Sequence, residues 1–190
     1  MIMYTFHDVM VVTNRKLCKQ ELTKQVAKLT KLNPQGIILR EKDLSEDQYE
    51  KLSIEILEIC RQGNVTCILH YYPEVAKRLH CKNIHLPLHK LREIKCDSSD
   101  FTIIGASVHS REEAREAEQL GATYLMAGHV FETDCKKGVT PRGLEFLREI
   151  CQNVTIPVYA IGGIKESNAE QVMACGAKGI CMMSTVMELT

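Results

Sequence analysis

Short runs of apolar, often β-branched residues recur along the chain about every 20 to 30 residues. They predict eight strands, at residues 9–13, 36–40, 65–70, 83–86, 101–107, 122–129, 156–163 and 179–184. Most of the intervening segments are charged and place apolar residues at three- and four-residue steps, which predicts helices. Because parallel strands need crossovers, this alternation favours a parallel sheet. Eight such units predict a (βα)8 TIM barrel, and an open doubly wound sheet is the competing architecture.

Residues that start and end helices support the same division of the chain. Ser45 with Gln48 predicts a capping box, and Gly63, Gly121 and Gly176 stand where helices are expected to end. The crossover at 88–99 has only a weak helical pattern. The sequence stops six residues after Ser184, so the last helix is expected to be truncated or missing. An uncovered part of the barrel wall would then suit contact with a second copy, so a homo-oligomer is expected.

Composition limits the kinds of partner. With 190 residues and 45% hydrophobic content, the chain is expected to form one domain over residues 1–190. The 24 basic and 24 acidic residues cancel, which argues against nucleic acid and anionic membranes and favours a small ligand. No apolar run approaches the roughly 20 residues of a membrane span. Nine cysteines without a CxxC pair argue against zinc and disulfides, and a cytoplasmic location is expected.

In such a barrel the functional residues follow the carboxyl ends of the strands. Gly162 and Gly163 follow the seventh predicted strand, and Ser184 and Thr185 follow the eighth. Glycines let backbone N–H groups approach an anion closely, so these loops predict a phosphate site. The alternative is that the two glycines only allow a tight turn.

Charged and titratable residues follow other strands. Arg40 and Lys42, two positions apart, are expected to point into the barrel mouth, although an ordinary solvated loop would look the same. His129 follows Gly128 at a strand end and is a candidate for proton transfer, with a buried structural histidine as the alternative. Three further histidines follow strand ends: His70, His85 and His109. Several imidazoles on one rim could bind zinc, but no HxH or HExxH pattern supports a metal site.

Five segments carry a resemblance to a known family. They are LREKDLSE (39–46), IHL (84–86), IGASVHSREEA (104–114), GHVFETDCKKG (128–138) and IPVYAIGGI (156–164). With them the chain resembles the thiamine phosphate synthase/TenI family over nearly its whole length. Synthases of that family carry a GPIFPT-type sequence where this chain has residues 128–138. The resemblance is therefore closer to TenI.

The resemblance implies a thiazole tautomerase, an isomerase of thiamine biosynthesis that makes a carboxythiazole phosphate aromatic by moving a proton. It implies no cofactor, a phosphorylated thiazole as substrate, and His129 as the proton shuttle. Phosphate would bind at Gly162, Gly163, Ser184 and Thr185. The other residues implied to line the pocket are Arg40, Lys42, Ser107, Thr133 and Lys136.

Two alternatives stay open. One is a thiamine phosphate synthase that joins hydroxymethylpyrimidine pyrophosphate to thiazole phosphate and uses magnesium. Synthases hold that ion with acids after the third and fourth strands, where this chain has His70-Tyr71 and Lys90. They recognise the pyrimidine with a glutamine, and the residue at that position here is Ile38. The other is a regulator that binds a phosphorylated ligand without catalysis.

Overall fold

The computed structural model describes residues 6–94 and 100–189, and its strands form one closed parallel barrel in chain order. The strands are β1 (Val9–Val12), β2 (Gly36–Leu39), β3 (Cys67–His70), β4 (Asn83–Pro87), β5 (Ile103–Val108), β6 (Tyr124–Gly128), β7 (Val158–Ile161) and β8 (Gly179–Met182). Met10 of β1 pairs with Gly36 on one side and with Cys181 on the other, which closes the sheet. The predicted (βα)8 barrel is confirmed, and the open sheet is excluded.

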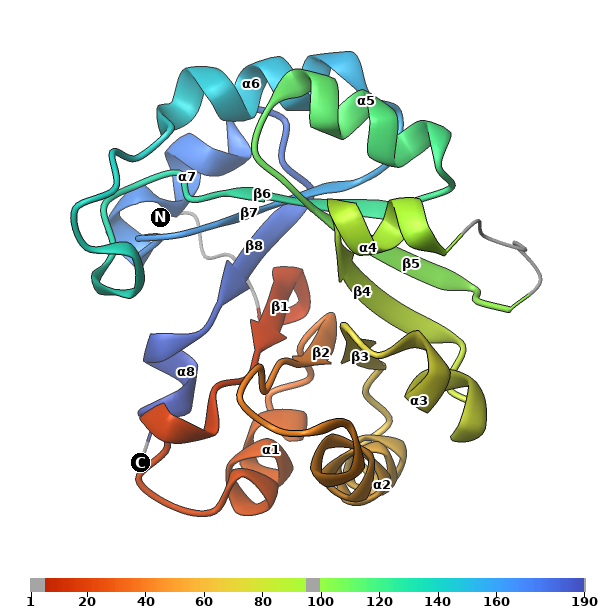
Figure 1. Ribbon diagram of the computed structural model, residues 1–190. Coiled ribbons are helices and arrows are strands. Elements are labelled where there is room, and N and C mark those ends of the chain that lie inside the picture. The colour runs from red at the N-terminus through yellow and green to blue at the C-terminus, as the bar shows by residue number, and fades with distance from the viewer. Residues whose placement is uncertain (1–5, 95–99, 190) are drawn as a thin grey trace.

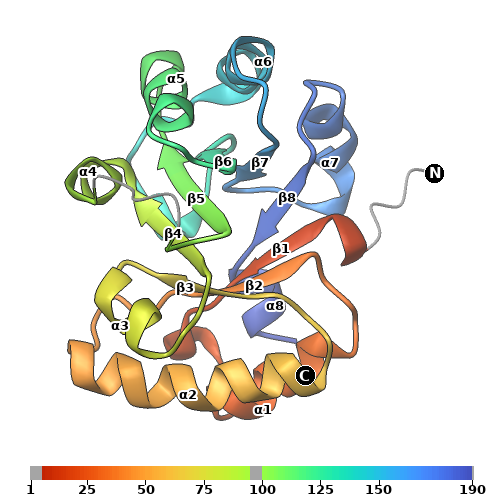
Figure 2. The same ribbon diagram turned by 90° about the vertical axis from the view of Figure 1, so that its right-hand side faces the viewer.

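Helices surround the strands (Figures 1 and 2), with α1 and α2 on one side of the barrel and α5 and α6 on the opposite side. The α-helices are α1 (Leu22–Thr30), α2 (Glu46–Gln62), α3 (Pro73–Arg78), α4 (Leu88–Glu93), α5 (Arg111–Gln119), α6 (Gly143–Asn153), α7 (Glu166–Met173) and α8 (Ser184–Met187). The described residues also form three short 3-10 helices: η1 (Phe6–Asp8), η2 (Arg15–Leu17) and η3 (Asp134–Lys136). None of the helices in the described ranges has the length and apolar character to cross a membrane.

Each strand is buried on both faces because its side chains alternate between the barrel interior and the helices. In β1, Met10 and Val12 belong to the inner cluster, whereas Val9 and Val11 pack in the layer beneath the helices. Ile38 and Met126 are further members of the inner cluster. This double burial explains why the strands appear in the sequence as nearly continuous apolar runs.

The ends of the elements follow the predicted residues in most places. Ser45 and Gln48 form the predicted capping box at the start of α2. Gly63 ends α2 with an ordinary φ of −81°, and the next residue, Asn64, takes the left-handed turn with φ of 53°. The weak 88–99 crossover contains only the short α4 within its described part, and residues 95–99 lie outside the described ranges.

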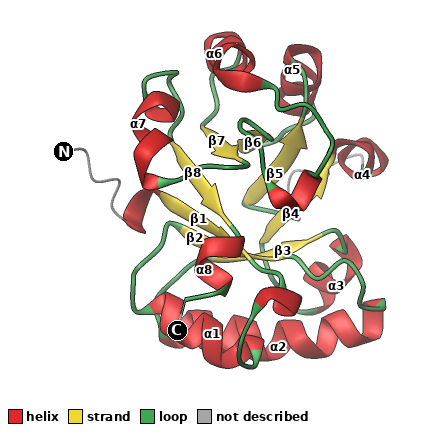
Figure 3. Ribbon diagram, turned by 90° about the vertical axis from the view of Figure 1, so that its left-hand side faces the viewer, coloured by secondary structure: helices red, strands yellow, loops and turns green. Residues whose placement is uncertain are grey.

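The last helix is truncated, as predicted. α8 has four residues and packs near the start of the chain, where the side-chain amide of Gln25 donates to the Val186 carbonyl at 2.7 Å. Figure 3 shows α8 in front of the ring of strands, close to the C-terminus. The residues that follow β8 and begin this short helix therefore lie next to the carboxyl ends of the other strands.

Candidate active site

A cavity of about 1380 Å³ opens at the carboxyl ends of the strands. It is lined by loops that follow most of the strands, so it lies where the barrel architecture predicts a functional site. All ten residues predicted for the site line it: Arg40, Lys42, Ser107, His129, Thr133, Lys136, Gly162, Gly163, Ser184 and Thr185. The structure thus brings these ten residues together around one cavity.

The turn after β7 needs both of its glycines. Gly162 and Gly163 have φ of 103° and 64°, a region that side chains disfavour. A Cβ on Gly163 would lie 2.2 Å from the Glu132 carbonyl oxygen, and one on Gly162 would lie 2.3 Å from Cβ of His129. The tight turn is therefore real, and it packs directly against the loop that follows β6.

The start of α8 meets the same loop. The Ser184 hydroxyl lies 3.5 Å from the Cys135 thiol, which joins the residues after β8 to those after β6. On the other side, Asn168 of α7 donates to the Gly163 carbonyl at 3.0 Å and accepts from the Lys165 backbone N–H at 2.7 Å. The glycine turn and the hydroxyls of Ser184 and Thr185 thus form one fixed corner of the cavity.

A second region of the cavity is cationic. It contains Arg40, Lys42 and Lys136, and none of the three forms an ion pair with any carboxylate in residues 6–94 and 100–189. Burial lowers the pKa of Arg40. Burial also lowers the pKa of Lys42, and the positive charges of Arg40 and Lys136 lower it further. Cations left without acidic partners favour the binding of an anion.

The backbone at Arg40 is held by two buried neighbours. The Thr13 hydroxyl accepts from the Arg40 N–H at 2.9 Å and donates to the Glu41 carboxylate at 2.7 Å. Glu41 also accepts from the backbone N–H of Arg15 at 3.1 Å and from its guanidinium at 3.0 Å. The negative charge of Glu41 is therefore shared with Arg15, and the segment that carries Arg40 is fixed.

Two histidines form a stacked pair beside these cations. The register of β3 and β4 pairs His70 with His85, and their rings stack at 5.8 Å between centroids with 13° between planes. The two nitrogens of His85 are hydrogen-bonded to Tyr124 and Ser107, each at 2.8 Å. Burial lowers the pKa of His85 to about 3, and burial and then the charge of His85 lower the pKa of His70. Both rings are therefore neutral near pH 7.

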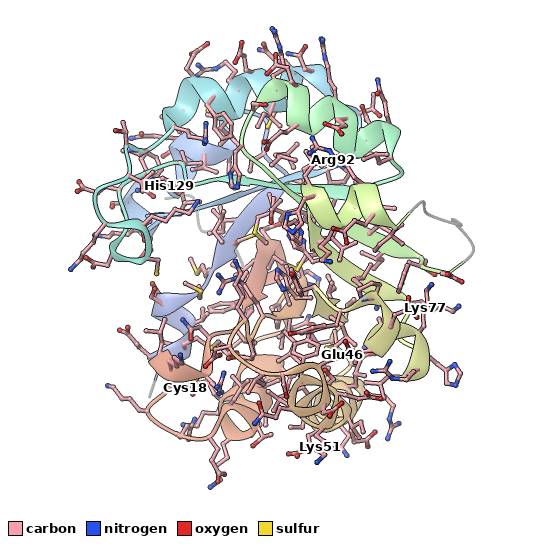
Figure 4. All side chains as sticks on the ribbon, viewed as in Figure 1. Cys18, Glu46, Lys51, Lys77, Arg92 and His129 are labelled. Carbon is pink, nitrogen blue, oxygen red and sulfur yellow. The ribbon has the colours of Figure 1, made fainter. Side chains whose placement is uncertain are left out.

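His129 lines the cavity but is only 4% exposed. Its Nε2 lies 3.2 Å from the Val139 carbonyl oxygen, which can only accept, so this nitrogen carries the hydrogen. Its Nδ1 has no partner among the described residues. Figure 4 shows the ring beside the loop that follows β6. The predicted role of His129 as a proton shuttle stays a prediction.

The residues at the expected magnesium position do not fit that ion. Tyr71 offers a phenol, and the Lys90 ammonium lies 2.6 Å from Glu93 and 5.4 Å from the Tyr71 ring centroid. Magnesium prefers carboxylate oxygens and water. Within the described part of the chain, no three acidic, histidine or cysteine side chains are grouped so that they could hold a metal.

Some cavity residues were missed from the sequence. Lys165 and Cys135 line the cavity together with the predicted residues. Lys165 follows the glycine pair by two positions, and a cation so close to a predicted phosphate turn could have indicated it. Cys135 stands next to Lys136, but only the fold shows that its thiol reaches Ser184.

Comparisons with known proteins place the chain in a family. A family model described as thiamine monophosphate synthase matches residues 9–186. A relative named thiamine-phosphate synthase from Pyrococcus abyssi is 38% identical over an alignment of 182 residues that covers 93% of this chain and 85% of that protein. One of the same name from Fusobacterium nucleatum is 31% identical over 94% of this chain and 88% of its own. A solved structure titled thiamine phosphate pyrophosphorylase from Pyrococcus furiosus has a TM-score of 0.82 and 32% identity, covering 97% of this chain and 89% of its own.

These findings correct the predicted activity. Isomerisation by a thiazole tautomerase was predicted mainly from residues 128–138, whereas the relatives match along most of the chain and are named synthases. The tautomerase prediction is therefore wrong, whereas the predicted membership of the family is confirmed. The physical reason is that residues 128–138 form one loop at the mouth, whereas the family likeness rests on the whole barrel. The chain belongs to the thiamine monophosphate synthase family.

Proposed function

We propose that this protein is a thiamine-phosphate synthase, a transferase that joins hydroxymethylpyrimidine pyrophosphate to thiazole phosphate. One observation carries the proposal: a single cavity is lined by two sets of residues suited to anions, the glycine corner at Gly162 and Gly163 and the cations Arg40, Lys42 and Lys136. Its volume of about 1380 Å³ exceeds the roughly 300–1,000 Å³ of an ordinary one-ligand pocket, so two substrates have room. The names of the relatives support the same activity.

Each region is assigned to one substrate. The thiazole phosphate binds at the glycine corner, where backbone N–H groups of the turn and the hydroxyls of Ser184 and Thr185 are available. The diphosphate binds at the cationic region, with Thr133 beside it. The neutral ring of His70 and the apolar side chain of Ile38 also line the cavity, and the proposal assigns them to the pyrimidine ring.

The reaction needs charge stabilisation more than proton transfer. The lone pair of the thiazole nitrogen forms a C–N bond to the pyrimidine methylene carbon, the C–O bond to the diphosphate breaks, and its electron pair leaves with the diphosphate. Positive side chains stabilise the charge that develops on the leaving group. Because no proton leaves the reacting atoms, the proposal gives His129 a structural part, in which its contact with Val139 holds the loop that carries Lys136.

Incubation of the protein with both substrates, followed by mass spectrometry, tests the proposal. Thiamine phosphate should form, and Arg40→Gln should lower turnover by about 10² to 10³, the usual effect of removing one group that stabilises developing charge. Lys178→Gln is the matched control, because Lys178 is exposed and precedes β8 at the opposite end of the barrel. Binding of both substrates without product would contradict the proposal and favour a regulator that only binds its ligand.

A further inference from the structure

We infer that the cavity binds the diphosphate group of its substrate with side-chain cations alone, without a divalent metal ion. The inference rests on the proposed function, because it concerns the diphosphate of that reaction. Three observations on the described residues support it. The β3 and β4 units supply no carboxylate to the cavity, two of the carboxylates that line it already bind other side chains, and three of its cations form no ion pair.

The β3 and β4 units supply no acid to the cavity. Their carboxylates between residues 65 and 94 are Glu74 and Glu93, and neither lines it. Glu74 is exposed and pairs with Lys77 at 3.4 Å, and Glu93 pairs with Lys90 at 2.6 Å. From this side a metal-bound diphosphate would meet imidazole and phenol groups, from His70, His85, His89, Tyr71 and Tyr72, and no carboxylate.

The acids that do line the cavity come from other loops, and two of the four are engaged. Glu41 accepts from Thr13 and Arg15, and Asp134 pairs with Lys137 at 3.3 Å. Glu132 and Glu188 complete the set. Magnesium bound to a phosphate substrate usually takes one or two carboxylates. Glu132 and Glu188 are both exposed and come from separate elements, the loop after β6 and the end of α8, and the described residues offer no group of three candidate ligands.

The cations provide the charge that a metal would otherwise supply. A diphosphate ester carries roughly three negative charges near neutral pH. Arg40, Lys42 and Lys136 bring three positive charges that form no ion pair with a carboxylate of the described chain. They repel one another when the cavity is empty, as the effect of Arg40 and Lys136 on Lys42 indicates. A bound diphosphate relieves this repulsion, and Arg40 can contact two of its oxygens at once.

Titration calorimetry with inorganic pyrophosphate tests the inference on the full chain. One titration contains EDTA and the other contains magnesium chloride. Pyrophosphate should bind in EDTA with a dissociation constant no larger than in magnesium, because magnesium only competes for it in solution. Arg40→Gln and Lys136→Gln should each weaken binding in EDTA by about 10- to 100-fold, the loss expected for a hydrogen bond to a charged group. Lys178→Gln should leave it unchanged.

Binding that is detectable only with magnesium, or that magnesium tightens about tenfold or more, would overturn the inference. So would Arg40→Gln and Lys136→Gln variants that are folded by circular dichroism and bind as tightly as the unchanged protein. The test needs no turnover, so it separates the two proposals. Pyrophosphate binding in EDTA without condensation of the two substrates would defeat the proposed function alone, whereas condensation that requires magnesium would defeat this inference alone.

Discussion

Thr13→Val isolates the buried contact that fixes Arg40. Valine keeps the size and branching of threonine but removes the hydroxyl, which accepts from the Arg40 N–H at 2.9 Å and donates to Glu41 at 2.7 Å. Thr13 is fully buried, so water cannot replace either hydrogen bond. One neutral hydrogen bond contributes about 0.5–1.5 kcal/mol and one to a charged group about 1.5–3 kcal/mol. The free energy of unfolding should therefore fall by about 2–4 kcal/mol.

Urea denaturation followed by circular dichroism measures this loss, and calorimetry with pyrophosphate measures its effect on the site. Diphosphate binding should weaken along with stability, because Arg40 loses the contact that holds its backbone. Thr13→Ser is the matched control, since serine keeps the hydroxyl and loses only a methyl group. If Thr13→Val unfolds at the same urea concentration as both the unchanged protein and Thr13→Ser, the hydroxyl does not hold the segment and the argument fails.

Three further predictions concern the same cavity. Gly163→Ala should destabilise the fold by about 1–3 kcal/mol in urea denaturation and weaken thiazole phosphate binding, because the new Cβ would lie 2.2 Å from Glu132 O at a φ of 64°; unchanged binding would contradict the assigned corner. His85, whose pKa is about 3 when folded, takes up a proton near pH 6.5 only on unfolding, so stability should decrease from pH 6.5 toward 3 by about 1.4 kcal/mol per unit. His85→Gln should reduce the measured slope by that amount and leave the part due to His70, whose pKa is also lowered; an unchanged slope would refute the prediction. Iodoacetamide should react with the exposed thiol of Cys135, 3.5 Å from Ser184, and block phosphate binding. Phosphate binding by the Cys135→Ser variant should resist the reagent. If the reagent also blocks binding in that variant, the block does not arise at Cys135.

Much of the fold could be predicted because each strand is buried on both faces. Val9 and Val11 pack under helices while Met10 and Val12 fill the interior, so the whole strand is apolar and easily recognised. The position of the glycine turn and of Ser184 followed from the rule that sites gather at the carboxyl ends of barrel strands. These features depend on short segments of sequence and on general architecture.

The chemistry of the cavity was harder to predict because it depends on contacts between distant residues. The sequence does not reveal that Glu41 is shared with Arg15 while Arg40 is left without an acid, although both arginines follow neighbouring strands. It also does not show that His70 stacks on His85 across two strands. The tautomerase prediction is wrong for a related reason, because residues 128–138 are a short segment, whereas the likeness to proteins named synthases extends along most of the chain.

The most direct test of the proposed synthase is the stoichiometry of its products. The protein is incubated with hydroxymethylpyrimidine pyrophosphate and thiazole phosphate, and thiamine phosphate and released diphosphate are quantified over time. A synthase should produce both at equal rates and only when both substrates are present. Diphosphate release without thiamine phosphate, or no release while both substrates bind, would contradict it.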